Sequence, residues 1–154
     1  METLGNYLTD DHARCDALLR HAQQSVGASR WIEARRDAAA FRYALERHLL
    51  IEERIIFPAF EAALGHAASP TAAMRAEHLR IRAVAQRLAD AIEAHSAQDF
   101  VTHAEALLLT MHVHSEKEEG VLYPMIERVL ARRCPDLLSA ARAFGAWDDR
   151  ASAA

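Results

Sequence analysis

Histidine and glutamate recur in this sequence at a spacing that could bind metal ions. His48 and His114 are each followed four residues later by a glutamate, Glu52 and Glu118. Side chains four residues apart in a helix lie on one face about one turn apart, so each pair would present an imidazole beside a carboxylate. Iron, manganese and zinc all accept these ligands. The sequence has nine histidines but only two cysteines, so it carries no thiolate cluster for an iron–sulfur centre.

An internal repeat selects a larger set of such residues. The chain aligns with itself at an offset of 66 residues, which places His48 on His114 and Glu52 on Glu118. The repeat relates residues 9–64 to residues 75–130 without an insertion. Its shared histidines and glutamates are His12, His48, Glu52, His78, His114 and Glu118.

The chemistry of these six residues favours a site for two metal ions. Each falls on the apolar stripe of a predicted helix, and two buried carboxylates without partners would be costly. Six ligands are too many for one tetrahedral zinc ion. They fit two ions, with two histidines on each and both glutamates bridging. A bridging oxygen would give each ion a fifth ligand and leave a position open for a small ligand such as dioxygen, nitric oxide or peroxide.

The spacing leaves one alternative open for the carboxylates. Glu53 and Glu119 follow the histidines by five residues and could replace Glu52 and Glu118 if the helices are locally unwound.

Other residues near the motifs have simpler interpretations. His112 and Glu116 share the four-residue spacing, but they point about 200° away from His114 around the helix, so we expect them on the surface. Cys15 lies one turn from His12, where a buried inert thiol is expected. Tyr43 is either a hydrogen-bond donor near the site or an ordinary packing or surface residue.

Four amphipathic helices are expected to position these residues. Apolar residues recur at helical spacing in four segments, at residues 9–26, 30–64, 69–95 and 99–132. Short connections between them predict an all-α, antiparallel up-down-up-down four-helix bundle. Pro58 and Pro124 fall inside the second and fourth segments, where we expect a kink or a helix end. A short fifth helix at residues 136–144 would cap the bundle or mediate a dimer. Residues 1–147 then form one domain, and residues 148–154 a disordered tail.

Composition narrows the class of protein. The chain has 154 residues, 51% hydrophobic and 26% charged, with only five glycines and four prolines, which fits one helical domain. A net charge of −4 argues against a binder of duplex nucleic acid. No apolar run reaches the ~20 residues that span a membrane, and the N-terminus lacks the features of a secretory signal. We therefore expect a cytoplasmic protein with neither nucleic acid nor membrane as a partner, whose oligomeric state stays open.

Over essentially its first 130 residues the sequence resembles the bacterial hemerythrin-like family, the HHE cation-binding domain. The resemblance rests on Asp11-His12, His48-Leu-Leu-Ile-Glu52-Glu53 with Phe57-Pro58, Glu77-His78, and His114-Ser-Glu-Lys-Glu118-Glu119 with Tyr123-Pro124. It implies a four-helix bundle around two non-heme iron ions with a bridging oxo or hydroxo group. The four histidines of the repeat would then be iron ligands, and Glu52 and Glu118 would bridge the ions.

One departure from the family bears on function. Oxygen-carrying hemerythrins resemble this pattern but have a fifth histidine one turn from the position of His78, where this sequence has Met74 and Arg82. This difference puts reversible oxygen carriage in question and makes the set more similar to relatives implicated in nitric oxide response and iron–sulfur repair.

Three hypotheses about function follow. The first is a di-iron protein that binds or reduces dioxygen, nitric oxide or peroxide. The second is a non-catalytic sensor of oxygen, nitric oxide or iron, or an iron donor for iron–sulfur repair. The third is a helical adaptor without metal. Whether the protein is an enzyme stays open.

Overall fold

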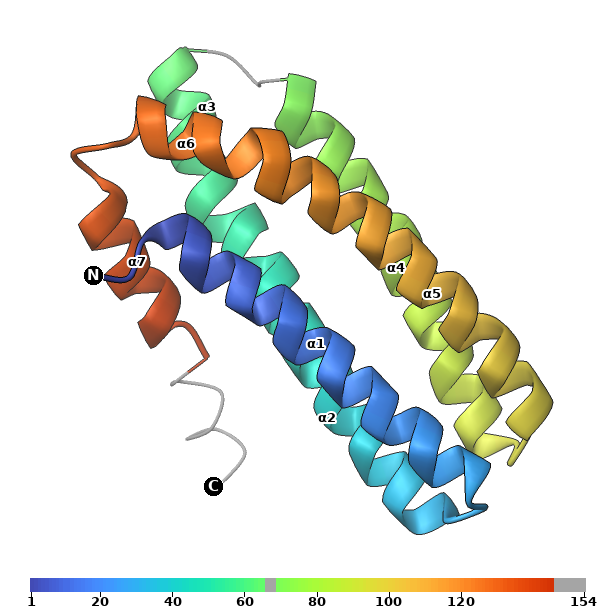
Figure 1. The fold of residues 1–154 in the computed structure, drawn as a ribbon. Coiled ribbons are helices and arrows are strands. Elements are labelled where there is room, and N and C mark those ends of the chain that lie inside the picture. The colour runs from blue at the N-terminus through green and yellow to red at the C-terminus, as the bar shows by residue number, and fades with distance from the viewer. Residues whose placement is uncertain (66–68, 146–154) are drawn as a thin grey trace.

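Four long helices form an antiparallel bundle in the computed structural model, which describes residues 1–65 and 69–145 (Figure 1). The elements in chain order are α1 (Leu4–Gly27), α2 (Trp31–Ile51), η1 (Glu52–Ile56), α3 (Phe57–Leu64), α4 (Ser69–Glu93), α5 (Ala97–Lys117), η2 (Glu118–Leu122), α6 (Tyr123–Val129) and α7 (Cys134–Ala143). Helices α1 and α4 each contact both α2 and α5, so the four helices surround a common interior. The predicted bundle and its short C-terminal helix are confirmed.

Several ends of the predicted helices lie a few residues away, and the fourth segment, predicted at residues 99–132, runs from Ala97 to Val129. Helix α1 begins at Leu4 rather than at residue 9, because the Thr3 hydroxyl accepts a hydrogen bond from the backbone N–H of Asn6 and caps the helix there. Helix α7 begins at Cys134, before the predicted start, with Pro135 in its first turn. The expected tail at residues 148–154, and the domain boundary at residue 147, lie outside the described residues.

The prolines of the second and fourth segments produce π-helical turns. Element η1 precedes Pro58 and η2 precedes Pro124. In each, an N–H bonds five residues back, as from Phe57 to the carbonyl of Glu52. In a regular α-helix a proline ring would meet the carbonyl four residues before it, and the wider turn accommodates the ring without ending the helical path. Each interruption is thus a π turn, and it begins at Glu52 or Glu118.

Two apolar clusters fill the interior of the bundle. One contains residues such as Phe41, Leu45, Ile81 and Leu107. The other contains residues such as Leu8, Phe57, Ile126 and Leu138, and it includes α7. The apolar residues of α7 therefore cap the end of the bundle.

Arg47 of α2 connects α7 to the bundle through hydrogen bonds. Its guanidinium donates hydrogen bonds to the carbonyls of Ala141 and Phe144 at 2.9 and 3.0 Å, and to the hydroxyl of Tyr7. These carbonyls belong to the last turn of α7, where a helix has no backbone donors left to offer.

Replacing this arginine should therefore destabilise the fold. Arg47→Met keeps much of the aliphatic stem but removes the charged donors, so we expect the free energy of unfolding to fall by about 2 kcal/mol. Urea denaturation followed by circular dichroism measures the change. Arg36→Met is the matched control on α2, because the Arg36 side chain is 76% exposed and its ion pair within the described part of the chain is a long one, 3.8 Å from Asp37. An equal loss in both variants would contradict a special role for Arg47.

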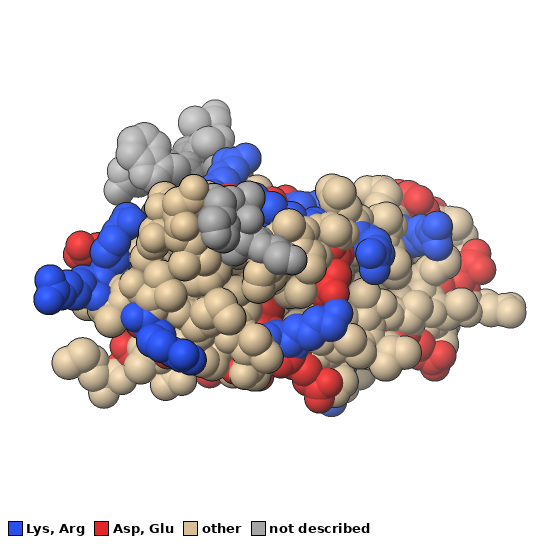
Figure 2. Space-filling model, turned by 90° about the horizontal axis from the view of Figure 1, so that it is seen from above, with Lys and Arg blue, Asp and Glu red and all other residues tan. Residues whose placement is uncertain are grey.

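The surface carries both signs of charge. On the described part of the face drawn in Figure 2, basic and acidic side chains are interspersed among uncharged ones. None of the described helices combines the length and the apolar character needed to cross a membrane.

Candidate metal centre

The six residues predicted from the repeat converge in the interior of the bundle. Helices α1 and α4 contribute one histidine each, while α2 and α5 each contribute a histidine and lead directly into a π turn that starts with a glutamate. His48, Glu52, His78, His114 and Glu118 are buried, and His12 is nearly so. The structure thus brings together the whole predicted set.

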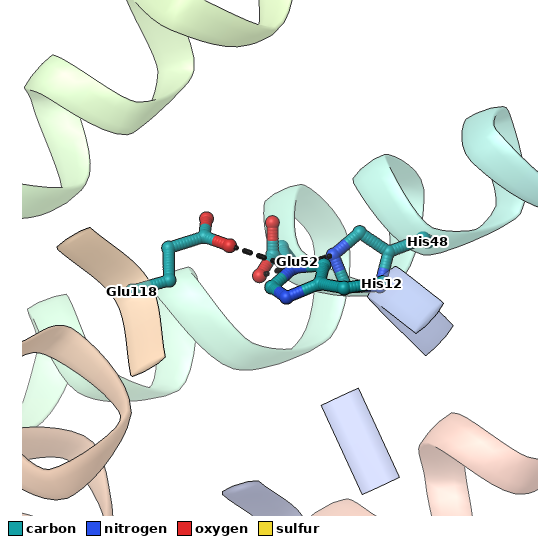
Figure 3. Close-up of side chains that lie close together, drawn as sticks. All are labelled: His12, His48, Glu52 and Glu118. Atoms are coloured by element: carbon teal, nitrogen blue, oxygen red, sulfur yellow. Dashed lines mark hydrogen bonds and ion pairs between the residues drawn. The ribbon is translucent and has the colours of Figure 1, made fainter. Parts of the chain in front are cut away.

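These residues form two groups whose nitrogen and oxygen atoms lie close enough to hold metal ions. The first group is His12, His48, Glu52 and Glu118, drawn in Figure 3, and the second group is His78, His114, Glu52 and Glu118. Within each group the potential ligand atoms lie within 4.8 Å of one another. Glu52 and Glu118 belong to both groups.

Each shared carboxylate directs one oxygen to each group. Glu118 lies 3.0 Å from Nε2 of His12 through Oε2 and 2.9 Å from Nε2 of His114 through Oε1. Glu52 lies 3.5 Å from Nε2 of His48 through Oε1 and 3.1 Å from Nε2 of His78 through Oε2. This is the arrangement required of two carboxylates that bridge neighbouring ions.

The other nitrogen of each imidazole, Nδ1, faces an acidic side chain outside the six. The pairs are His12 with Glu119 at 2.7 Å, His48 with Asp11 at 3.4 Å, His78 with Glu53 at 2.8 Å and His114 with Glu77 at 2.7 Å. An ionised carboxylate can only accept, so each Nδ1 carries the proton and Nε2 faces the interior. Such partners fix the tautomer and orientation of metal-binding histidines.

These contacts give the neighbouring glutamates different positions, and the choice of Glu52 and Glu118 as ligands stays a prediction. Glu52 and Glu118 point into the centre, whereas Glu53 and Glu119 contact the imidazoles from outside. The roles of Asp11 and Glu77 were missed from the sequence. The available signal was that the repeat places an acidic residue directly before His12 and before His78.

Removing an outer carboxylate should weaken metal binding while the fold persists. Glu119→Ala takes away the acceptor of the His12 Nδ1–H, and we expect metal affinity to fall by about 10- to 100-fold. Competition with a chromophoric chelator measures the affinity. Glu116→Ala is the control, since the ion pair that Glu116 makes among the described residues is with the exposed His112. Equal affinity in the two variants would show that the outer carboxylate does not tune the site.

In the metal-free centre, contacts between imidazoles and carboxylates shift the pKa values of His12, His78 and Glu118 toward their charged forms. Burial lowers the pKa of His78, but its contacts with Glu118, Glu52 and Glu53 outweigh burial and raise that pKa to about 10. The same balance raises the pKa of His12 to about 9. Burial raises the pKa of Glu118, but the three histidines around it hold that pKa well below its usual value. Protons on the imidazoles therefore supply positive charge that a metal ion could supply instead.

Unsatisfied atoms in the second group fit a bound cation. Within the described part of the chain, four buried side-chain atoms make no well-directed hydrogen bond, and all belong to this group: Glu52 Oε2, His78 Nε2, His114 Nε2 and Glu118 Oε1. They approach only one another, at 3.1 Å between Glu52 and His78 and 2.9 Å between Glu118 and His114. Buried polar atoms are normally paired, so such a convergence calls for an explanation. A cation coordinated by two imidazoles and two carboxylates would pair all four.

A tyrosine beside Pro124, whose hydroxyl the sequence pattern did not single out, reaches the first group. The buried hydroxyl of Tyr123 lies 2.5 Å from Glu52 Oε1, 2.9 Å from Glu118 Oε2 and 3.2 Å from His12 Nε2. Burial raises the pKa of Tyr123 well above its usual value, so the hydroxyl keeps its proton. Its repeat equivalent is Phe57, whose ring packs against His78 with centroids 5.8 Å apart.

The two residues one helical turn from His78, Met74 and Arg82, do not face the centre. Met74 is buried in an apolar cluster. Arg82 pairs with Glu46 and Glu53. Neither side chain belongs to the two groups that could hold a metal.

The remaining predicted positions behave as ordinary residues. His112 and Glu116 form an exposed pair, as expected. Cys15 is buried, and burial raises the pKa of its thiol to about 12, which fits an inert residue. Tyr43 is 48% exposed and is a surface residue.

A small cavity adjoins the centre. It measures about 10 Å³ and touches His12, His48 and His114, with an otherwise mostly apolar lining that includes Leu45, Ile81 and Met111. A volume of this size holds about one water molecule. Only a very small molecule would fit beside the three histidines without displacing side chains.

Comparison with known proteins assigns the chain to a family. Searches of curated proteins and of solved structures find no match. The family model described as the hemerythrin HHE cation binding domain matches residues 3–126, which is most of the chain. The protein therefore belongs to the hemerythrin HHE cation-binding domain family.

Proposed function

We propose that the protein is a non-heme di-iron protein that binds or reduces a small ligand such as dioxygen, nitric oxide or peroxide. The observation that carries the proposal is the pair of buried groups that share Glu52 and Glu118. His12 and His48 would hold one ion, and His78 and His114 the other. Membership of a cation-binding family supports the use of these residues for metal. The bridging oxo or hydroxo group expected from the sequence stays a prediction.

Iron would supply one-electron redox chemistry and a coordination position for the ligand. The chain's own residues supply the rest. The outer carboxylates hold the imidazoles by Nδ1, and the two apolar clusters limit access of water to the interior. The cavity of about 10 Å³ beside His12, His48 and His114 has room for about one water molecule, so it favours the smallest ligands, and a diatomic molecule would have to displace side chains slightly.

Metal content and an optical spectrum test the proposal. Protein purified without air should contain two iron ions per chain, one for each group. Exposure to air should then produce near-ultraviolet bands of oxidised iron. Folded protein without stoichiometric metal would overturn the proposal and leave a helical adaptor.

A second measurement separates turnover from sensing. Repeated additions of peroxide should be consumed while the iron content stays constant if the protein reduces its ligand. Loss of iron on the first addition, with a change in binding to a partner, would instead support the sensor or iron donor.

A further inference from the structure

The two groups of the centre contain the same kinds of side chain, but their surroundings differ at one position of the repeat. All four unsatisfied buried atoms belong to the second group. The equivalent oxygens of the first group, Glu52 Oε1 and Glu118 Oε2, both lie within hydrogen-bond distance of the Tyr123 hydroxyl. Phe57, which replaces this tyrosine beside the second group, offers no hydroxyl.

The Tyr123 hydroxyl must leave its present contacts, or change them, when a cation enters the first group. It has one proton to donate and two carboxylate oxygens within reach, at 2.5 and 2.9 Å. It also lies 3.2 Å from His12 Nε2, so it contacts three of the four side chains of this group. A cation drawing these atoms together would compete with the hydroxyl for the same lone pairs.

The second group has no such hydroxyl. Its imidazoles also contact the shared carboxylates, His78 at 3.1 Å from Glu52 and His114 at 2.9 Å from Glu118, but the first group has matching contacts of His48 and His12 with the same two glutamates. A cation must therefore replace imidazole–carboxylate contacts in either group, and only in the first group must it also displace a hydroxyl.

Outer charges do not reverse this difference. Arg14 and Arg47 lie near Asp11, behind the first group. Behind the second group, Arg82 pairs with Glu53, and Lys117 with Glu77. Arg75 also lies over the Phe57 ring, 5.5 Å from its centroid. The second group thus has three cationic side chains nearby and the first has two, and each of the five is paired with a carboxylate.

We propose that Tyr123 makes the two metal positions fill in order, with the second group, His78 and His114, taking the first divalent cation and the first group the second. This inference rests on the proposed function, because it uses the same six residues as ligands. Tyr123 acts as a positioning residue, because its hydroxyl binds the carboxylate oxygens of Glu52 and Glu118 that face the first group.

Stepwise titration of the metal-free protein tests the order. With Co²⁺ alone as the probe, followed by calorimetry, the native protein should bind two ions in steps whose affinities differ by about tenfold or more, the scale of a hydrogen bond to a charged group. Tyr123→Phe removes the hydroxyl and should strengthen the second step by about the same factor, bringing the two steps together. Phe57→Tyr, the matched change at the repeat position, should weaken the first step.

A crystal of the native protein grown with one equivalent of Co²⁺ locates the first ion. Anomalous scattering should place it between His78 and His114. This measurement decides the order even if a variant fails to fold.

The outcomes separate the inference from the function on which it rests. Two equal binding steps in the native protein, or a first ion between His12 and His48, would overturn the order of filling and leave the two-ion centre standing. Absence of Co²⁺ binding would overturn the metal centre and the order with it.

Discussion

Glu118→Gln should abolish binding of both metal ions and lower the unfolding temperature of the metal-loaded protein by about 10 °C or more. Glutamine keeps the volume of the side chain but removes the charge that contacts His12, His78 and His114. Because Glu118 belongs to both groups, a single substitution removes an oxygen ligand from each. Few residues of the chain are placed to affect two sites at once.

The size of the effect follows from linkage. A ligand at 100 times its dissociation constant stabilises the native state by about 2.7 kcal/mol, so two ions would add roughly 5 kcal/mol. In a domain of this length each kcal/mol shifts the unfolding temperature by about 2–4 °C. Metal analysis and calorimetry of the loaded protein measure the two effects together.

Glu116→Gln is the matched control for this prediction. It lies two residues earlier on α5 and pairs with His112, and both side chains are about two-thirds exposed (66% and 68%). This variant should keep two ions and the native unfolding temperature. A Glu118→Gln protein that kept full metal would show that Glu118 is not a ligand.

Metal affinity should fall steeply as the pH is lowered. The pKa values of about 9 for His12 and about 10 for His78 mean that both imidazoles are protonated in the metal-free protein at pH 7. Metal binding requires neutral imidazole, so loading both groups must release at least these two protons. Each displaced proton lowers the apparent affinity about tenfold per pH unit below the imidazole pKa.

Proton release gives a direct measurement. Calorimetric titrations at pH 7 in buffers of different ionisation enthalpy should report about two protons or more per fully loaded chain. Glu119→Ala removes one of the carboxylates that raise the His12 pKa and should reduce the number released. Metal binding without proton release would contradict the charged state assigned to these histidines.

The stability of the metal-free protein should decrease as the pH is raised, whereas metal affinity should increase. A pKa raised on folding adds stability that is fully present below the unfolded value of 6.5 and is lost as the pH rises through the folded value. These histidines therefore favour the metal-free fold at neutral pH and cease to do so between about pH 9 and 10. Metal binding is strongest in the range where that contribution is lost.

The sequence predicted the bundle and the six central residues because both depend on periodicity. A spacing of four residues fixes which side chains share a helix face, and the repeat shows which of those faces correspond. Asp11 and Glu77 were missed because their contacts, with His48 and His114, run between helices. Helical spacing shows which residues share a face of one helix, but not which residues of two helices meet.

Helical spacing could predict neither the π turns nor the contacts of the Tyr123 hydroxyl. A proline signals that a regular helix is disturbed, but whether the helix ends, bends or widens depends on how the flanking segments pack. For Tyr123, the repeat matched one aromatic residue with another and gave no sign that a single hydroxyl would reach between two carboxylates.

The repeat also has a consequence for symmetry. Two identical helical hairpins assembled about a twofold axis would carry the same side chain at every equivalent position, so they would offer two tyrosine hydroxyls or none. Here both hairpins belong to one chain, and position 57 can be phenylalanine while position 123 is tyrosine. Covalent continuity thus permits a difference that a homodimer of hairpins could not sustain. One oxygen atom is enough to make the two sides of an otherwise twofold centre distinct.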